Sequence, residues 1–381
     1  MASIFEELGV RPVLNAMGNR TLLGGSTPSA TVRALMDEAE SDYVNMSDLM
    51  DAVGVKIAEM IGAEAALVTS GCSAALAVGA AACMTGNDPE KIDQLPDTAG
   101  MPNEFIIQRQ LRIKYDRSLT IPGGKLVEVG DAEETRPEHI EAAIGLRTAG
   151  IHYLAPGDRP GALPIEEVIR IGQAHNIPVI VDAAGEVYPT DKFGRYVKMG
   201  AKLAAYGAKY FGAVNSSGML VGDKDLVEIA RAHSFIGFES STSRSIGRPM
   251  KVDRQEVVAV YAALREWLTT NHEDRLASYE VRVERQRSEL IDIPNLTMTN
   301  YPVDGPVIGL VVRMDTAKVG KTAGEVVAEL KTGNPSIWVR SPQERPDEYP
   351  PGENGFVILM HLLKEGGEQV IAERLKEILP G

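Results

Sequence analysis

A single lysine, Lys209, lies in the small-residue segment LAAYGAKYFGAVNSSGMLVG, which runs from Leu203 to Gly222. Six glycines or alanines lie within five positions of this lysine, and a short apolar run stands on each side of it. Lysine is the side chain that forms Schiff bases with carbonyl groups, and small neighbours leave room for a planar cofactor. A solvated surface charge is the more common role of a lysine in a turn, so other parts of the chain must decide between these interpretations.

A second segment, IPVIVDAAG, ends an apolar run with Asp182, which is followed by Ala183, Ala184 and Gly185. We expect its carboxylate to lie at the end of a buried strand, where an acid needs a cation or a hydrogen-bond donor. A protonated pyridine nitrogen is one suitable partner, and the small residues that follow would let a flat ring lie close to the backbone. An acid that caps a neighbouring helix is the alternative interpretation.

A third segment, TSGCSAAL, joins a strand-like run to a helix-like run. Its turn and first helical positions are Ser70, Gly71, Cys72 and Ser73. Unpaired backbone N–H groups and the helix dipole at such a helix start favour a phosphate group. Tyr206, three residues before Lys209, is a candidate hydroxyl donor to the same phosphate. An ordinary serine-capped helix is the alternative interpretation of this segment.

Strand-like and helix-like segments alternate from about Ala63 onward. The strand-like runs are AALVTSG, EFIIQ, KLVEVG, AGIHYLAP, IPVIVDAAG, KLAAYG and GMLVG, and the helix-like runs include SAALAVGAAACM, RPEHIEAAIG, LPIEEVIRIGQAHN and DKDLVEIARAH. This order predicts an α/β fold with a mostly parallel sheet that helices cover on both faces. In such sheets ligands bind beyond the carboxyl ends of the strands, and the three segments described above fall at strand ends.

The sequence predicts two domains. Residues 46–260 hold the alternating segments and form the expected large domain. Residues 261–381 contain long helical patterns, the strand-like runs VIGLVVRM and PSIWVR, and the helix-like run EQVIAERLKEIL, which indicates a smaller α+β domain. Residues 1–45 are expected to pack with this smaller domain.

Composition excludes several classes of function. The net charge is −14 over 381 residues with no long basic run, so we expect no nucleic-acid partner. The two cysteines and six histidines show no metal-binding spacing, so no metal is expected. The acidic N-terminus has no signal-peptide pattern, and no apolar run is long enough to span a bilayer, which favours a cytoplasmic protein without a membrane partner.

The chain order of phosphate loop, strand-end acid and turn lysine resembles that of pyridoxal-phosphate enzymes of the aspartate-aminotransferase fold type (fold type I). The resemblance implies that Lys209 forms the internal aldimine with pyridoxal 5'-phosphate and that Asp182 keeps the ring nitrogen protonated. It also implies that the helix start binds the phosphate, with Ala184 beside the ring. Lys125, in IPGGKLVEVG, also lies among glycines, but it precedes Asp182 and begins a predicted strand, so we expect it at the other end of the sheet.

The chain also resembles the selenocysteine-synthase-like family of pyridoxal-phosphate enzymes, which includes seryl-tRNA selenium transferase and D-glucosaminate-6-phosphate ammonia-lyase. The resemblance rests on VLNAMGNRTLLGGS, GAEAALVTSGCSAAL, IIQRQLRIKYDRSLTIPGGKLVEVG, VIVDAAGEVYP, GAKYFGAVNSSGMLVG and IGRPMKVDRQE. The chain departs from the family pattern beside the lysine, where Val214 replaces a proline and an aromatic residue replaces a basic one. The cofactor chemistry therefore carries over more directly than the substrate.

The resemblance implies a lyase that removes a β-substituent, with release of water or ammonia, from a small amino acid or amino sugar acid. Lys209 is the expected proton shuttle, and the substrate carboxylate needs a bidentate cation, for which Arg340, Arg20 and Arg109 are candidates. Aldol cleavage, racemisation and transamination would use the same residues and stay open as alternatives. A tRNA-dependent selenium transferase is disfavoured by the acidic charge, and a cofactor-binding protein without catalysis is a further alternative. The fold type implies a homodimer or higher homo-oligomer with shared active sites.

Overall fold

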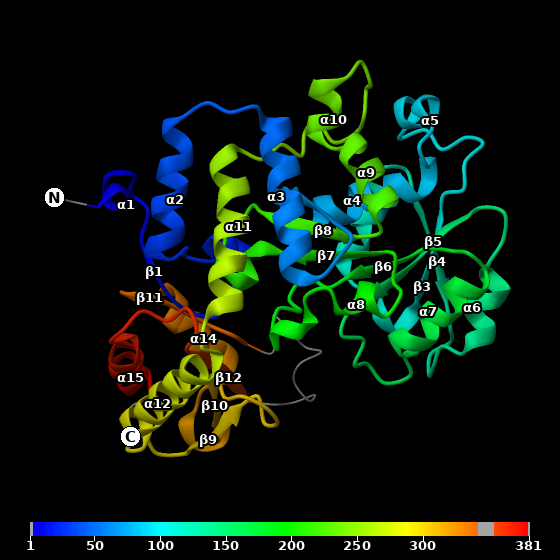
Figure 1. Cartoon of the computed structure of the whole chain (residues 1–381). Coiled ribbons are helices and arrows are strands. Elements are labelled where there is room, and N and C mark those ends of the chain that lie inside the picture. The colour runs from blue at the N-terminus through cyan, green and yellow to red at the C-terminus, as the bar shows by residue number, and fades with distance from the viewer. Residues whose placement is uncertain (1–2, 342–353, 380–381) are drawn as a thin grey trace. The chain divides into compact units, whose positions relative to one another are not determined.

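The structure, a computed structural model, describes residues 3–341 and 354–379 (Figure 1). The chain divides into two compact units. The small unit contains Met1–Ser26 and Thr270–Gly381, and the large unit is Thr27–Thr269. Within the described ranges, no helix has both the length and the apolar character needed to cross a membrane.

A seven-stranded sheet forms the centre of the large unit, in the order β2-β8-β7-β6-β5-β3-β4. The strands are β2 (Ala65–Thr69), β3 (Glu104–Gln108), β4 (Lys125–Val129), β5 (Thr148–Leu154), β6 (Val179–Asp182), β7 (Leu203–Gly207) and β8 (Gly218–Gly222). Strands β4, β3, β5, β6 and β7 run parallel, whereas β8 is antiparallel to both of its neighbours, β2 and β7. The prediction of a mostly parallel sheet is confirmed.

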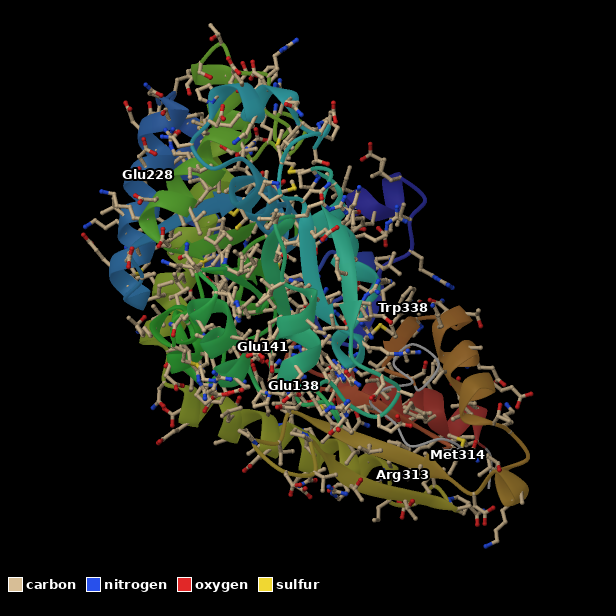
Figure 2. The ribbon with its side chains drawn as sticks, turned by 90° about the vertical axis from the view of Figure 1, so that its right-hand side faces the viewer. Glu138, Glu141, Glu228, Arg313, Met314 and Trp338 are labelled. Atoms are coloured by element: carbon tan, nitrogen blue, oxygen red, sulfur yellow. The ribbon has the colours of Figure 1, made fainter. Side chains whose placement is uncertain are left out.

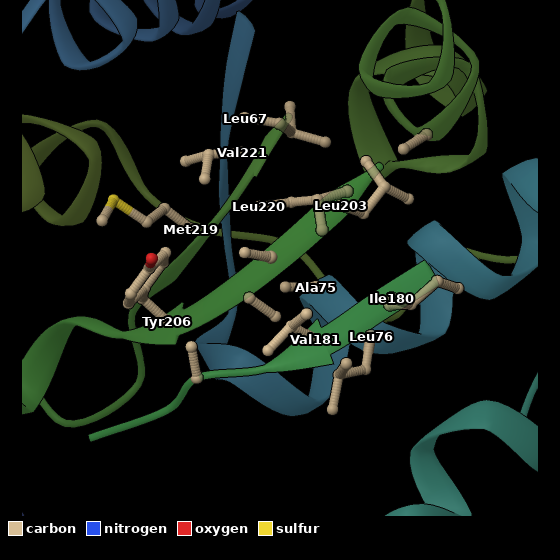
Figure 3. Packing of buried hydrophobic residues seen from close by; sticks show 14 of the residues in the cluster. Leu67, Ala75, Leu76, Ile180, Val181, Leu203, Tyr206, Met219, Leu220 and Val221 are labelled. Carbon is tan, nitrogen blue, oxygen red and sulfur yellow. The ribbon is translucent and has the colours of Figure 1, made fainter. Parts of the chain in front are cut away.

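Helices cover both faces of this sheet, as predicted. A Cβ on Gly79 of α4 (Gly71–Thr85) would lie 3.3 Å from Leu203, so α4 packs on the face to which Leu203 points. Ile180 pairs with Leu203 and shares that face, whereas Val179 contacts Gly172 of α7 (Ile165–Ala174) on the other. Figure 3 shows buried apolar side chains of α4 and of strands β2, β6, β7 and β8, on both faces of the sheet.

The remaining elements of the large unit surround this sheet. They are α2 (Ala30–Ser41), α3 (Met46–Ile61), α5 (Pro89–Gln94), α6 (Pro137–Ala143), α8 (Arg195–Lys198), α9 (Lys224–His233), α10 (Phe235–Ser240), α11 (Arg254–Thr269), and the 3₁₀ segments η2 (Arg109–Leu111), η3 (Lys114–Thr120), η4 (Thr190–Lys192) and η5 (Ala208–Phe211).

The boundaries between the two units fall at other residues than the sequence predicted. Residues 27–45 belong to the large unit because α2 packs against α11. Ser29 donates its hydroxyl to Glu266 at 2.6 Å, and Arg254 donates to the carbonyl of Ala39 at 2.8 Å. These contacts are not visible as a pattern in the sequence, so the predicted boundaries at residues 45 and 260 differ from those of the structure.

The small unit holds two sheets. In the first, β1 (Val13–Ala16) pairs in parallel with β11 (Ser336–Val339), and in the second, β12 (Gly355–Leu359), β10 (Gly309–Met314) and β9 (Leu296–Tyr301) are antiparallel. Arg313 of β10, labelled in Figure 2, donates to Thr299 of β9 at 2.9 Å. The other elements are α1 (Ile4–Glu7), η1 (Thr21–Leu23), α12 (His272–Leu290), α13 (Thr316–Val319), α14 (Ala323–Thr332) and α15 (Gly367–Ile378).

A buried ion pair joins two helices of the small unit. Glu368, in the first turn of α15, is fully buried, and its carboxylate lies 2.6 Å from Nε of Arg282 on α12. The Arg282 guanidinium also donates to the carbonyls of Met360, Leu363 and Lys364. Burial raises the pKa of Glu368, but the hydrogen bonds from Arg282 and from its own backbone, together with the charges of Arg282 and Arg285, outweigh this effect, so the pKa is lowered overall. The Glu368 carboxylate is therefore ionised, and its buried charge is compensated mainly by Arg282.

We expect Arg282→Ala to lower the free energy of unfolding by about 3 kcal/mol, because it leaves a buried carboxylate and three carbonyls without their donor. Urea unfolding at neutral pH measures this change. Arg285→Ala is the matched control, because Arg285 lies 3.9 Å from the same carboxylate but is nearly half exposed. Its removal should change the free energy by less than about 1 kcal/mol. Equal losses in the two variants would contradict this role of Arg282.

Candidate active site

Asp182 ends β6 at the carboxyl edge of the parallel strands. It is 5% exposed, and it pairs with Ala205, on the same face of the sheet as α4. One carboxylate oxygen, Oδ1, accepts the Ala184 N–H at 3.1 Å and the Cys72 thiol at 3.4 Å. The other oxygen accepts no hydrogen bond from any described residue. Burial raises the pKa of Asp182, so the site favours a positively charged donor at this open oxygen.

The start of α4 lies next to this carboxylate. Ser70 is the N-cap residue, but its side chain makes no capping hydrogen bond. Gly71 has φ +84°, which only glycine adopts easily, and it turns the chain from β2 into the helix. Cys72 comes next, and burial and the neighbouring Asp182 raise the pKa of its thiol. The thiol is therefore protonated and donates to Asp182, while the helix start faces the same edge of the sheet.

The segment that carries Lys209 connects β7 to β8. It begins with η5, in which the Ala208 N–H donates to the carbonyl of Ser217 at 3.0 Å and so closes the loop. The Lys209 Nζ lies 5.3 Å from the centre of the Tyr210 ring, and its charge acts on the Cys72 thiol to lower the thiol's pKa. The structure thus brings Lys209, Cys72 and Asp182 together.

The other lysine that the sequence singled out, Lys125, is the first residue of β4. Since β4 runs parallel to β6, this position lies at the opposite edge of the sheet from Asp182. The structure therefore places Lys125 away from the residues around Lys209.

His152 is a residue of this site that the sequence-based reasoning missed. It lies on β5, where it pairs with Ile180, so its side chain shares the α4 face with Asp182. Its imidazole is buried, and among the described residues Nδ1 has no hydrogen-bond partner. Burial lowers the pKa of His152, although the nearby Asp182 charge opposes this effect. A neutral ring with one unused nitrogen therefore lies beside Asp182.

Tyr206 lies on the other face of the sheet. It follows Ala205, which pairs with Asp182, and successive strand residues point to opposite faces. Its hydroxyl donates to the carbonyl of Lys192 at 3.0 Å and accepts the N–H of Gly194 at 3.2 Å. Figure 3 shows its ring packed near Met219. The Tyr206 hydroxyl, which we expected to donate to the phosphate, is therefore hydrogen-bonded to the backbone of Lys192 and Gly194 instead.

The three candidate arginines fall in different places. Arg109 begins η2 after β3, and its Nε lies 3.9 Å from Glu128, with more than half of its side chain exposed. Arg20 and Arg340 belong to the small unit. There Arg340 donates to the Tyr301 hydroxyl at 2.9 Å. The assignment of the substrate carboxylate to one of these arginines stays a prediction.

The residues at this edge of the sheet fit a pyridoxal phosphate. The open oxygen of Asp182 suits a protonated ring nitrogen, since a cation there offsets the burial of the carboxylate. The unused Nδ1 of buried His152 provides a second polar atom on the same face. The uncapped start of α4 suits the phosphate, and Lys209 supplies an amine. All four features belong to the large unit.

Comparisons with known proteins find relatives along the whole chain. No model of a known protein family matches. The chain is 33% identical over 387 residues to a Streptomyces 5'-C-glycyluridine monooxygenase-decarboxylase, covering 98% of this chain and 92% of that one. It is 27% identical over 385 residues to D-glucosaminate-6-phosphate ammonia lyase of Salmonella typhimurium, covering 99% and 98%.

Solved structures agree with these sequence relatives. A structure of D-glucosaminate-6-phosphate ammonia-lyase matches with a TM-score of 0.86 and 27% identity, covering 100% of this chain and 98% of that one. An aspartate aminotransferase of Thermus thermophilus matches with a TM-score of 0.55 and 18% identity, covering 99% and 94%. The second likeness concerns the fold alone, and together they confirm the predicted fold type I.

We expect Gly218→Ala to disturb the start of α4. A Cβ at Gly218 would lie 2.5 Å from the carbonyl carbon of Gly71 and 2.7 Å from the backbone nitrogen of Cys72, so the helix start must shift. The free energy of unfolding should fall by about 1–3 kcal/mol, and the protein should retain less pyridoxal phosphate after dialysis. Gly145→Ala is the control, because no atom lies within 4 Å of the position that its methyl group would take and its φ is not left-handed. Unchanged stability and cofactor content in Gly218→Ala would contradict this close approach.

Proposed function

The chain belongs to the selenocysteine-synthase-like family of pyridoxal-phosphate enzymes, and we propose that it removes a β-substituent from a small amino acid or amino sugar acid. Two predictions from the sequence, pyridoxal 5'-phosphate as the cofactor and a lyase as the class of enzyme, are confirmed by these relatives. The observation that carries the proposal is the open oxygen of buried Asp182 at the carboxyl edge of the sheet, where its hydrogen-bond donor Cys72 also feels the charge of Lys209.

Pyridoxal phosphate, when bound, withdraws electrons from the α-carbon of an amino substrate. The chain's own residues would hold it by two non-covalent contacts. The free oxygen of Asp182 would bind the protonated ring nitrogen, and the N–H groups at the start of α4 would bind the phosphate. Cys72 and Ala184 keep the Asp182 carboxylate in place through hydrogen bonds to Oδ1.

Lys209 is the proposed covalent anchor and proton carrier. Its Nζ accepts the proton that leaves the substrate α-carbon and returns a proton to the departing β-hydroxyl, which leaves as water. The resulting enamine takes up water and gives a 2-oxo acid and ammonia, so atoms and charge balance without an oxidant. The closed loop between β7 and β8 holds the lysine backbone in place during these transfers.

The assembly and location of the protein are part of this proposal. We infer a small-molecule substrate, a cytoplasmic location and a homo-oligomer with shared active sites. The net charge of −14 opposes binding to tRNA, which supports the lyase over a tRNA-dependent selenium transferase.

Borohydride reduction of the holoenzyme followed by peptide mapping should place the cofactor on Lys209, because this lysine follows β7 at the carboxyl edge of the sheet and its charge acts on Cys72, the hydrogen-bond donor to Asp182. Lys209→Ala should give no labelled peptide. Lys125→Ala is the matched control and should label as the unchanged protein does, because Lys125 lies at the other edge of the sheet. A label on Lys125 would overturn the assignment.

Ammonia release tests the reaction. We expect sustained release of ammonia and 2-oxo acid in equal amounts from some member of a panel of β-hydroxy amino acids and amino sugar acids, without added oxo acid. The rate should be the same with and without dioxygen, because the proposed elimination consumes no oxidant. Release that stops after one turnover would indicate a transaminase instead. Dioxygen consumption with carbon dioxide release would place the reaction with that of the Streptomyces relative.

Asp182→Asn tests the role of this carboxylate in the same assay. It keeps the shape of the side chain but removes the charge that faces the ring nitrogen, so the rate of ammonia release should fall by about 10²–10³-fold. Unfolding curves should confirm that the fold is retained. A rate equal to that of the unchanged enzyme would mean that the ring does not lie against Asp182.

A further inference from the structure

An aromatic ring, that of Tyr210, lies next to the amine of Lys209. Tyr210 follows Lys209 in η5, at the carboxyl end of β7, and its side chain is half-buried. The Lys209 Nζ lies over the face of this ring, 5.3 Å from the ring centre. The face of an aromatic ring is negative and attracts an ammonium group at such a distance. The ring is therefore a binding surface for the amine whenever the amine is positively charged.

Two glycines lie against opposite edges of the Tyr210 ring. A Cβ on Gly207, the last residue of β7, would lie 3.1 Å from Cδ2 and 3.2 Å from Cε2 of the ring. A Cβ on Gly185, in the segment after β6, would lie 3.9 Å from Cδ1 and Cε1 on the other edge. The Gly207 N–H donates to the carbonyl of Ala184 at 3.0 Å, which ties the two backbone segments together. The backbone thus confines the ring from both sides.

The small residues near Lys209 therefore do more than leave room for a cofactor. Gly207 precedes the lysine by two positions, and Gly185 follows Asp182 by three. Both glycines approach the ring of Tyr210, so this ring fills part of the space that they leave. A packed ring with a fixed position, and not a mobile side chain, borders the amine.

The Tyr210 ring offers the amine a partner without a charge of its own. The Lys209 charge also acts on the Cys72 thiol, but this thiol is protonated and donates to Asp182. The carboxylate of Asp182 is the proposed partner of the cofactor's ring nitrogen. A neutral ring face stabilises the ammonium of Lys209 without taking this carboxylate away from the cofactor.

We infer that Tyr210 is a positioning residue for Lys209, and that its ring face binds the ε-ammonium group while this group is not bonded to the cofactor. The inference rests on the proposed function, in which the substrate amine displaces Lys209 and the released amine accepts and returns a proton. Lys209 is then the end of a flexible four-carbon side chain, and the ring gives its charged form a defined place. Because the attraction acts on the charged form, the ring also favours uptake of the substrate's α-proton.

Covalent attachment of pyridoxal phosphate to the full chain, after removal of the cofactor, tests this inference without turnover. The neutral amine is the form that attacks a carbonyl, so the attachment rate, followed by absorbance, rises with pH through a midpoint. Tyr210→Leu and Tyr210→Met should both lower this midpoint by about half a pH unit, because the ammonium loses the ring that stabilises it. Methionine is flexible enough to fill the place of the ring if leucine does not.

Two variants serve as controls in this titration. Tyr210→Phe keeps the ring and removes the hydroxyl, so its midpoint should equal that of the unchanged chain. Phe211→Leu removes the next ring of the same loop, which packs against Phe193, and it should not move the midpoint either. A fall in either control as large as that in Tyr210→Leu would overturn the inference, and so would unchanged midpoints in both Tyr210→Leu and Tyr210→Met.

The other titratable groups on the elements around Lys209 are the same in all of these chains, so they contribute equally to every midpoint. They include Cys72 of α4, His152 of β5, Asp182 at the end of β6, Glu186 in the segment that follows, and Glu256 of α11, which accepts the hydroxyl of Ser216 in the loop that carries Lys209.

Turnover then separates the positioning of Lys209 from contact with the substrate. With a substrate that releases ammonia, Tyr210→Leu should lower kcat by about two- to fivefold with KM and cofactor content unchanged, and Tyr210→Phe should keep the original kcat. A raised KM with an unchanged kcat would mean that Tyr210 binds the substrate, and would overturn the inference. If no amino acid or amino sugar acid releases ammonia, the proposed function fails, while the pH midpoint still decides the role of Tyr210.

Discussion

The carboxylate of Asp182 is removed from water by folding, and the arrangement at the sheet edge depends on how its charge is compensated. An isolated buried carboxylate is costly, and burial alone would favour its neutral form. The chain itself provides only partial compensation, through the Ala184 N–H and the weak donor Cys72, both at the same oxygen. Neutral His152 on the next strand adds no positive charge. A bound cationic ring therefore supplies the positive charge that the described residues do not provide for the Asp182 carboxylate.

The sheet topology determines which side chains surround this carboxylate. Because β6 and β7 are parallel and in register at Asp182 and Ala205, a small side chain lies directly beside the acid. The antiparallel β8 brings Gly218 against Gly71, so the start of α4 can approach the strands closely. The same reversal of direction at the end of β7 produces the loop that carries Lys209. One topological feature thus positions both the helix start and the amine.

Reasoning from the sequence singled out residues whose chemical type stands out in a local pattern. It missed residues whose roles depend on how the strands pair. Asp182 and Lys209 stood out because an acid after an apolar run and a lysine among small residues are local patterns. Tyr206 was misplaced because its face of the sheet follows from the pairing of Ala205 with Asp182, which no local pattern reveals. His152 was missed for the same reason, since it reads as one residue of an apolar strand.

Long-range packing also explains the difference in domain boundaries. Helix α2 joins the large unit through hydrogen bonds to residues on α11, more than 200 positions later in the chain. The parallel pairing of β1 with β11 is equally remote in sequence, and it ties the first residues to the small unit. Neither contact leaves a periodic signal. The alternating runs of residues 63–233, whose partners are mostly near neighbours in sequence, were predicted much more completely.

The way in which the loop between β7 and β8 is anchored limits its local opening motions. Both of its ends are fixed in the centre of a sheet, and the Ala208 amide is bonded across the loop to Ser217. Opening the loop therefore requires breaking the ladders between β7, β8 and their neighbours, which lie in the most buried part of the large unit. Amide hydrogens in this region should exchange with solvent only through global unfolding. The lysine backbone thus keeps its place through local fluctuations, and the motions that admit substrate and release product must occur in other segments.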